Sequence, residues 1–86
     1  MKVKKKALSK LIDILKTIPQ TTEAEEIQTK IYTVGKENGY SNDLRSWFKL
    51  IYEVTFGVEN GPRMGFFISF FGVKETIDLM KKKLRM

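Results

Sequence analysis

The stretch GVENGPRMGFFISFFG, residues 57–72, decides the fold class of this chain of 86 residues. Its central part, FFISFF, is a short apolar run between glycines, and periodicity alone does not distinguish a buried strand from a buried helix in such a run. A single strand would have no pairing partner, because the other segments have helical patterns. We therefore predict a short helix that begins at Pro62, whose missing N–H is tolerated in a first helical turn, and ends at Phe71.

Four other segments repeat apolar residues every three or four positions, which is the pattern of one buried helix face. We expect these helices over residues 7–17, 23–38, 43–56 and from 73 onward. The predicted N-caps are Thr22, with Glu25 completing a capping box, and Ser41 or Asn42. The helices are expected to end at residues that disfavour a helix interior, namely Pro19, Gly39, Gly57 and Gly72.

These elements predict one domain, residues 1–86, with an all-α fold: a compact bundle of about five short helices. Residues 1–6 are expected to be a basic tail that need not be ordered. In the phenylalanine-rich helix, Gly65 and Ser69 should form a flat side that another backbone can approach closely. Phe67 should point into the core, and Phe71 with it.

The composition excludes several kinds of chemistry. The chain has no cysteine and no histidine, which removes disulfides, Cys/His zinc sites, thiol nucleophiles and imidazole bases. The paired carboxylates, Glu25 with Glu26 and Glu75 with Asp78, lie on polar helix faces beside lysines and are interpreted as solvated. The glycines match no phosphate-cradling pattern. We therefore predict no catalytic residue, no metal ligand and no cofactor in this chain.

No segment approaches the roughly 18 consecutive apolar residues of a membrane-spanning helix, and the N-terminus lacks the pattern of a signal peptide. The sequence therefore predicts a cytoplasmic protein with no membrane partner. The lysine-rich, amphipathic start also fits a helix lying on an anionic membrane surface, but the helical core needs the same apolar residues.

The net charge of +6 is concentrated at the two ends of the chain. Residues 1–16 carry +5 and residues 81–86 carry +4, whereas residues 17–80 carry −3. Two interpretations stay open: the basic ends are solvated tails, or they attract phosphate groups.

Basic and aromatic residues occur together in the middle of the chain. Arg45 and Lys49 flank Trp47 and Phe48, and single-stranded RNA is commonly held by bases stacked on aromatic rings beside Arg or Lys. The alternative is that Trp47 and Phe48 belong to the core. The predicted RNA-binding residues are Lys36, Arg45, Lys49, Arg63, Phe66 and Lys74.

Arg63 opens the fourth predicted helix, where backbone N–H groups point outward and favour an anion. It has an alternative role inside the turn, as the partner of Glu59 or of a carbonyl at a helix C-terminus.

Three segments together resemble the C-terminal region of class I lysyl-tRNA synthetases of the bacterial type. They are IQTKIYTVGKENGY (27–40), LRSWFKLIYEVTFG (44–57) and GPRMGFFISFFGVKETIDLM (61–80). The resemblance implies an α-helical anticodon-binding domain, with the anticodon stem-loop of lysine tRNA and the catalytic domain of the synthetase as partners. The parent enzyme would be a lysine–tRNA ligase that uses ATP and magnesium.

The signatures of the catalytic domain are missing from this chain, so we expect an excised domain or the product of a split gene that cannot aminoacylate by itself. The resemblance implies a small or polar residue at position 66. Phe66 departs from that pattern and is expected at an RNA surface or at a contact with the catalytic domain. A second hypothesis is a non-catalytic interaction module, which docks on a protein partner through Phe66, Phe70 and the flat side at Gly65.

Overall fold

The computed structural model describes the backbone of residues 2–84 and the side chains of residues 5–84. The described chain contains helices and turns and no strand, so FFISFF is helical and the predicted all-α class is confirmed. The helices are α1 (Lys2–Thr17), α2 (Ala24–Gly35), α3 (Leu44–Phe56), α4 (Met64–Phe71) and α5 (Val73–Leu84), with a wide helical turn, η1 (Lys36–Tyr40), after α2.

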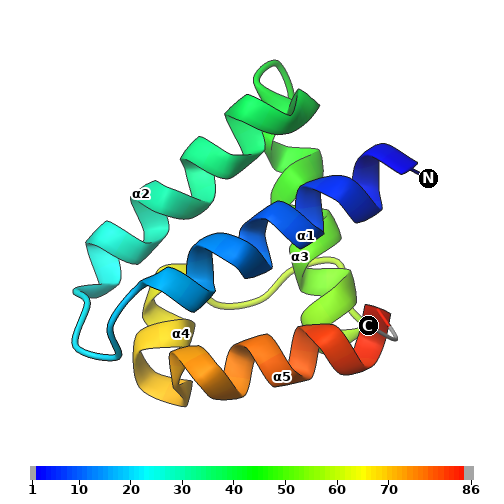
Figure 1. The fold of residues 1–86 in the computed structure, drawn as a ribbon. Coiled ribbons are helices and arrows are strands. Elements are labelled where there is room, and N and C mark those ends of the chain that lie inside the picture. The colour runs from blue at the N-terminus through cyan, green and yellow to red at the C-terminus, as the bar shows by residue number, and fades with distance from the viewer. Residues whose placement is uncertain (1, 85–86) are drawn as a thin grey trace.

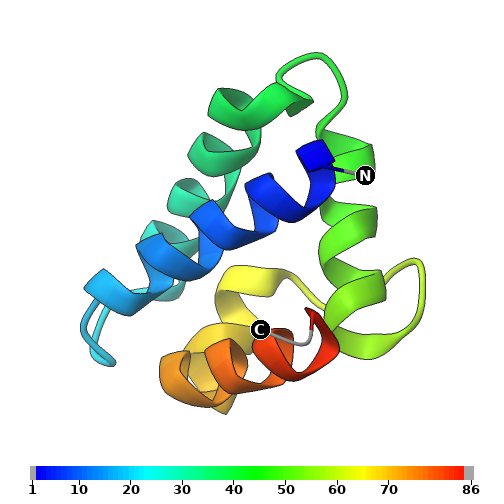
Figure 2. The ribbon, with the colours of Figure 1, turned by 45° about the vertical axis from the view of Figure 1, so that its right-hand side comes forward.

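Helix α1 lies between α2 and α5 in the view of Figure 1 and contacts both of them. It is antiparallel to α5, so the start of α1 and the end of α5 lie on the same side of the molecule in both views (Figure 2). Helix α3 packs against α5 and α2, and the short α4 packs along α2. The helix predicted from Ala7 begins earlier, at Lys2.

The core lies where these helices meet and is built from the predicted apolar faces. Trp47 is completely buried, and its indole N–H donates to the carbonyl of Ile31 at 2.9 Å. The core interpretation of Trp47 is therefore confirmed. The largest fully buried apolar side chains around it are Leu8, Leu11, Ile12, Leu15, Ile27, Ile31, Ile51, Met64, Ile68 and Met80.

The predicted N-caps of α2 and α3 are wrong. The N-cap of α2 is Glu23, which makes no side-chain capping bond. Thr22 lies in the turn before it, where its hydroxyl donates to the carbonyl of Pro19 at 2.7 Å. The N-cap of α3 is Asp43, one residue after Asn42 and two after Ser41. Its carboxylate accepts from the backbone N–H of Ser46 at 3.1 Å and from the Ser46 hydroxyl at 2.6 Å.

Helix α4 begins after Pro62 rather than at it, since Arg63 is the N-cap and Met64 the first helical residue. The close approach predicted at Gly65 is confirmed: a Cβ atom there would lie 2.7 Å from the backbone nitrogen of Gln28 on α2. Ser69 is exposed, so the flat side does not extend to it.

The two phenylalanines predicted for the core divide between core and surface. Phe67 is half-buried against the core and lies edge-on to Phe56, with ring centroids 4.8 Å apart. The core prediction for Phe71 is wrong: its side chain is 44% exposed, although its ring stacks on Phe67 at 5.0 Å. The ring is exposed because α4 ends there, and Gly72, with a φ of 117°, redirects the chain into α5.

Candidate RNA-binding face

Four aromatic side chains from α2, α3 and α4 lie at the surface or partly buried below it. We call them the aromatic face: Tyr32, Phe48, Tyr52 and Phe66. Tyr32 lies edge-on to Phe48, with ring centroids 5.0 Å apart, which connects α2 to α3. Tyr32 and Phe66 remain 39% and 46% exposed. Exposed rings of this kind can stack with a planar ligand.

Arg63 lies at the α4 end of the aromatic face. Its guanidinium carbon is 5.1 Å from the centroid of the Phe66 ring, which is within the range of a cation–π contact. The predicted alternative partner, Glu59, instead forms an ion pair with Lys49 at 3.5 Å. That pair is exposed on both sides and therefore contributes little to stability, so a stronger anion can compete for Lys49.

Tyr52 is a partly buried residue of α3, and its ring stacks on that of Phe56 with centroids 6.3 Å apart. Burial raises the pKa of its phenol above the ordinary value, the neighbouring Tyr32 raises it further, and the positive charge of Arg63 lowers it. The phenol is therefore neutral around pH 7 and can both donate and accept a hydrogen bond.

Lys36 and Arg45 extend the same helix surfaces. Lys36 follows Tyr32 by one turn, and Arg45 precedes Phe48 by one turn, so each cation lies on the same side of its helix as an aromatic residue. Both side chains are exposed. Of the predicted RNA-binding residues, Arg63 and Phe66 contact each other, Lys36 and Arg45 lie one turn from a member of the aromatic face, and Lys49 pairs with Glu59. Their role in binding stays a prediction.

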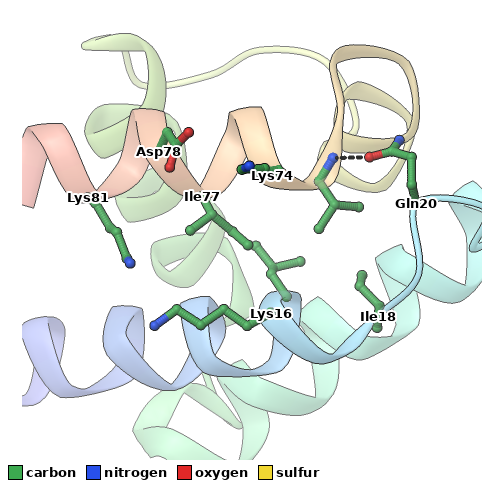
Figure 3. A pocket seen from close by; sticks show the side chains of 9 residues that line it. Lys16, Ile18, Gln20, Lys74, Ile77, Asp78 and Lys81 are labelled. Atoms are coloured by element: carbon green, nitrogen blue, oxygen red, sulfur yellow. Dashed lines mark hydrogen bonds between the residues drawn. The ribbon is translucent and has the colours of Figure 1, made fainter.

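Lys74 is the exception. It lies in the first turn of α5 and lines a cavity between α1 and α5, together with Lys16 and Lys81 (Figure 3). The structure does not bring it to the aromatic face.

The start of α4 offers fewer free N–H groups than the sequence predicts. The N–H of Gly65 donates to the side-chain oxygen of Gln28 at 2.6 Å, in a buried position. Gln28 therefore occupies a donor that an anion would otherwise use. Any anion at this helix start has to be held mainly by Arg63.

Three members of the aromatic face, Tyr32, Phe48 and Tyr52, were not among the predicted site residues, although Phe48 was considered as an alternative to a core role. Tyr52 was assigned to the buried side of its helix, and Tyr32 was not singled out. The sequence does contain a signal that Tyr32 is at the surface. It lies off the buried helix face that contains Ile31 and Val34, and one turn before Lys36.

Across the described residues, no group of three or more acidic, cysteine or histidine side chains could hold a metal ion. Within the same range, no helix is long and apolar enough to cross a membrane.

The fold and this face define a small all-α domain with an exposed surface of rings and cations. Comparison with known proteins points to one group of relatives. The lysine–tRNA ligase of Rickettsia bellii (strain OSU 85-389) is 44% identical over 80 residues, covering 93% of this chain and 15% of the ligase. The lysine–tRNA ligase of Rickettsia felis is 46% identical over 77 residues, covering 90% of this chain and 14% of the ligase.

The lysine–tRNA ligase of Rickettsia akari is 46% identical over 79 residues, covering 92% of this chain and 15% of the ligase. The chain therefore spans about 15% of the length of the curated relatives it matches. No family model matches the chain, and no solved structure matches it. The sequence is thus related to a segment of lysine–tRNA ligases.

Proposed function

We propose that this chain is the anticodon-binding module of a class I lysyl-tRNA synthetase, and that the aromatic face holds unpaired bases of the anticodon loop of lysine tRNA. The observation that carries the proposal is the guanidinium of Arg63 over the exposed ring of Phe66. Bases stack on such rings, while neighbouring cations hold the phosphates. The similarity to lysine–tRNA ligases supports lysine tRNA as the RNA.

In this proposal, the chain contributes binding and no chemistry. The ATP and magnesium used to attach lysine belong to the catalytic part of the synthetase, which is a partner of this domain in the cytoplasm. The absence of cysteine and histidine fits a role in which the side chains stack on bases and attract phosphates.

The proposal is tested by titrating the chain with the anticodon stem-loop of lysine tRNA and with the same stem-loop carrying a changed anticodon. We expect tighter binding of the first. Equal affinity for both would contradict anticodon reading, while leaving general RNA binding intact.

Phe66→Ala is expected to weaken binding of the lysine stem-loop roughly tenfold, since a base stacked on an aromatic ring contributes about 1–3 kcal/mol. Phe70→Ala is the comparison, because Phe70 lies one turn later on the same helix and is 92% exposed but has no cation–π contact with Arg63. If both substitutions weaken binding equally, the contact between Arg63 and Phe66 is not what holds the RNA.

A second candidate function is docking on a protein partner through the end of α4. Phe70 is 92% exposed and Phe71 is 44% exposed, and neighbouring exposed rings of this size usually mark an interface. The proposed partner is the catalytic part of the synthetase.

This candidate is tested by binding the chain to the purified remainder of the Rickettsia bellii ligase, without its matching segment. Phe70→Ser should weaken that binding and leave the RNA titration unchanged. Unchanged binding to the ligase remainder would exclude Phe70 as a docking residue.

A further inference from the structure

The two helices that carry the basic segments of the sequence contact each other. Helices α1 and α5 run antiparallel, so the start of α1 and the end of α5 point to the same side of the molecule (Figure 2). The described side chains of Lys5 and Lys6 on α1 and of Lys82 and Lys83 on α5 are exposed.

An open cavity of about 400 Å³ lies along the contact between α1 and α5. We call it the lysine cleft. Its rim carries the ammonium-bearing side chains of Lys16, Lys74 and Lys81, and its apolar lining consists of Leu15, Ile18, Val73 and Ile77. Lys16 extends from α1 and Lys81 from α5 over the same opening (Figure 3).

The positive charge of the lysine cleft is not neutralised within the described part of the chain. None of its three lysines lies within 4.0 Å of a carboxylate there, whereas Lys49 on α3 does. The one acidic residue of the cleft, Asp78, lies one turn after Lys74 on α5, and both are drawn on the side of α5 turned away from α1, whereas Lys16 and Lys81 point into the opening (Figure 3). The ammonium groups of Lys16 and Lys81 over one opening favour an anion from solution.

The lining of the cleft decides which part of a nucleic acid it can bind. It contains no aromatic ring, and its one amide side chain, Gln20, already accepts from the N–H of Val73 at 2.8 Å. The cleft therefore has no surface for base stacking and few groups for reading base edges. Lysine ammonium groups bind phosphate as point charges, and short aliphatic side chains can pack against a ribose.

We propose that the lysine cleft binds the phosphodiester backbone of RNA, independently of base sequence. The inference rests on the proposed RNA-binding function and adds a second contact, on different helices from the aromatic face and with different chemistry. The aromatic face selects the RNA, and the lysine cleft supplies affinity and orientation.

The test compares two double variants that lose the same charge. Lys16→Gln/Lys81→Gln removes two rim lysines of the cleft, and Lys10→Gln/Lys30→Gln removes two lysines outside it. Both variants, and the unmodified chain, are titrated over a range of salt concentrations with the lysine stem-loop and with the changed-anticodon stem-loop. Far-ultraviolet circular dichroism confirms that each variant is folded.

For the cleft variant we expect an equal loss of affinity for both RNAs, roughly tenfold at low salt. The slope of log affinity against log salt should become shallower by about 1.4, or about 0.7 for each single-stranded phosphate contact. The control variant should change the slope by less than half of this.

A slope that changes equally in the two variants, or in neither, would overturn the proposal, as would an absence of RNA binding at low salt. A loss confined to the lysine stem-loop would also overturn it, because the cleft would then read bases. Anticodon reading is judged separately, by the ratio of the two affinities in the unmodified chain. The two proposals can therefore fail independently.

Discussion

The starts of α4 and α5 are each held by a glutamine side chain from an earlier part of the chain, but the surroundings of the two bonds differ. Gln28 accepts from Gly65 at 2.6 Å in a buried contact between α2 and α4. Gln20 accepts from Val73 at 2.8 Å at the partly buried edge of the lysine cleft. Similar bonds thus hold one contact that excludes solvent and one that leaves an open cavity.

The difference follows from side-chain size. At the first contact, glycine lets the backbones of α2 and α4 touch, so nothing is left to bind a ligand. At the second, the side chains of Lys16 and Lys81 lie over an opening between α1 and α5 and do not fill it, while long lysine side chains keep their charged ends in water. The first contact therefore stabilises the fold, and the second leaves a surface on which an anion can bind.

The largest effect is expected from Gly65→Val, because the added side chain would no longer let α4 approach the backbone of α2. Its Cβ would meet the backbone of Ala24 and Gln28, and these backbone atoms cannot move as a flexible side chain can. We expect the free energy of unfolding to fall by about 3 kcal/mol, measured by urea denaturation.

Ser69→Val is the control, because Ser69 lies one turn later on α4 and is exposed. Its effect should stay within about 0.5 kcal/mol. Similar effects of the two substitutions would mean that the close approach of α2 and α4 is not required for stability.

Replacing each of the two glutamines by leucine is expected to lower the stability by a smaller amount. Gln28→Leu leaves the buried N–H of Gly65 without an acceptor and should cost about 2 kcal/mol. Gln20→Leu should cost less than about 1 kcal/mol, because water can reach Val73 through the open cleft. Equal costs in urea denaturation would show that the two bonds are equally shielded from solvent.

Sequence reasoning succeeds here where a residue's role depends on its own geometry. Gly57 ends α3 with a φ of 75°, which a glycine adopts easily, and Gly65 permits a close contact because it has no side chain. The apolar spacing of α1 and α5 likewise predicts their buried faces, since period 3.6 fixes which residues share a side.

Sequence reasoning fails where the position of a cap or the exposure of a side chain depends on which neighbouring group it meets. Thr22 is a good N-cap by type, but both its backbone N–H and its hydroxyl donate to the carbonyl of Pro19, which fixes Thr22 in the turn before the helix. At α3, Asp43 is the cap and accepts from both the N–H and the hydroxyl of Ser46. The exposure of Phe71 depends on where the next helix goes.

The candidate site was also only partly predictable from local sequence. Local composition identifies Arg63 and Phe66, which are close in the sequence, but the neighbours that surround them come from other helices. The grouping of Lys74 with Lys16 and Lys81 depends on the packing of α1 against α5, to which no local pattern refers. Tertiary contacts therefore divide the predicted site residues into two surfaces.

The smallest expected effect is the pH dependence of the cap at the start of α3, which can be compared with the glutamine caps of α4 and α5. That start is capped by the carboxylate of Asp43, whereas the two glutamine caps do not titrate. Hydrogen bonds from the hydroxyl and the backbone N–H of Ser46 hold the pKa of Asp43 below its ordinary value. A lowered pKa in the folded state adds stability above the unfolded pKa, and this contribution is lost as the pH falls through the folded pKa.

Asp43→Ala should therefore destabilise the chain slightly at pH 7, and its difference from the unmodified chain should shrink as the pH falls below the ordinary value of 3.8. The cost of Gln28→Leu should not shrink in this way, because the bond that it removes carries no ionisable group. Urea denaturation of both variants at pH 7 and at about pH 3 measures this, with the range chosen around the carboxylate pKa. If the two costs change in parallel with pH, the charge of Asp43 contributes nothing to the cap beyond its oxygen atoms.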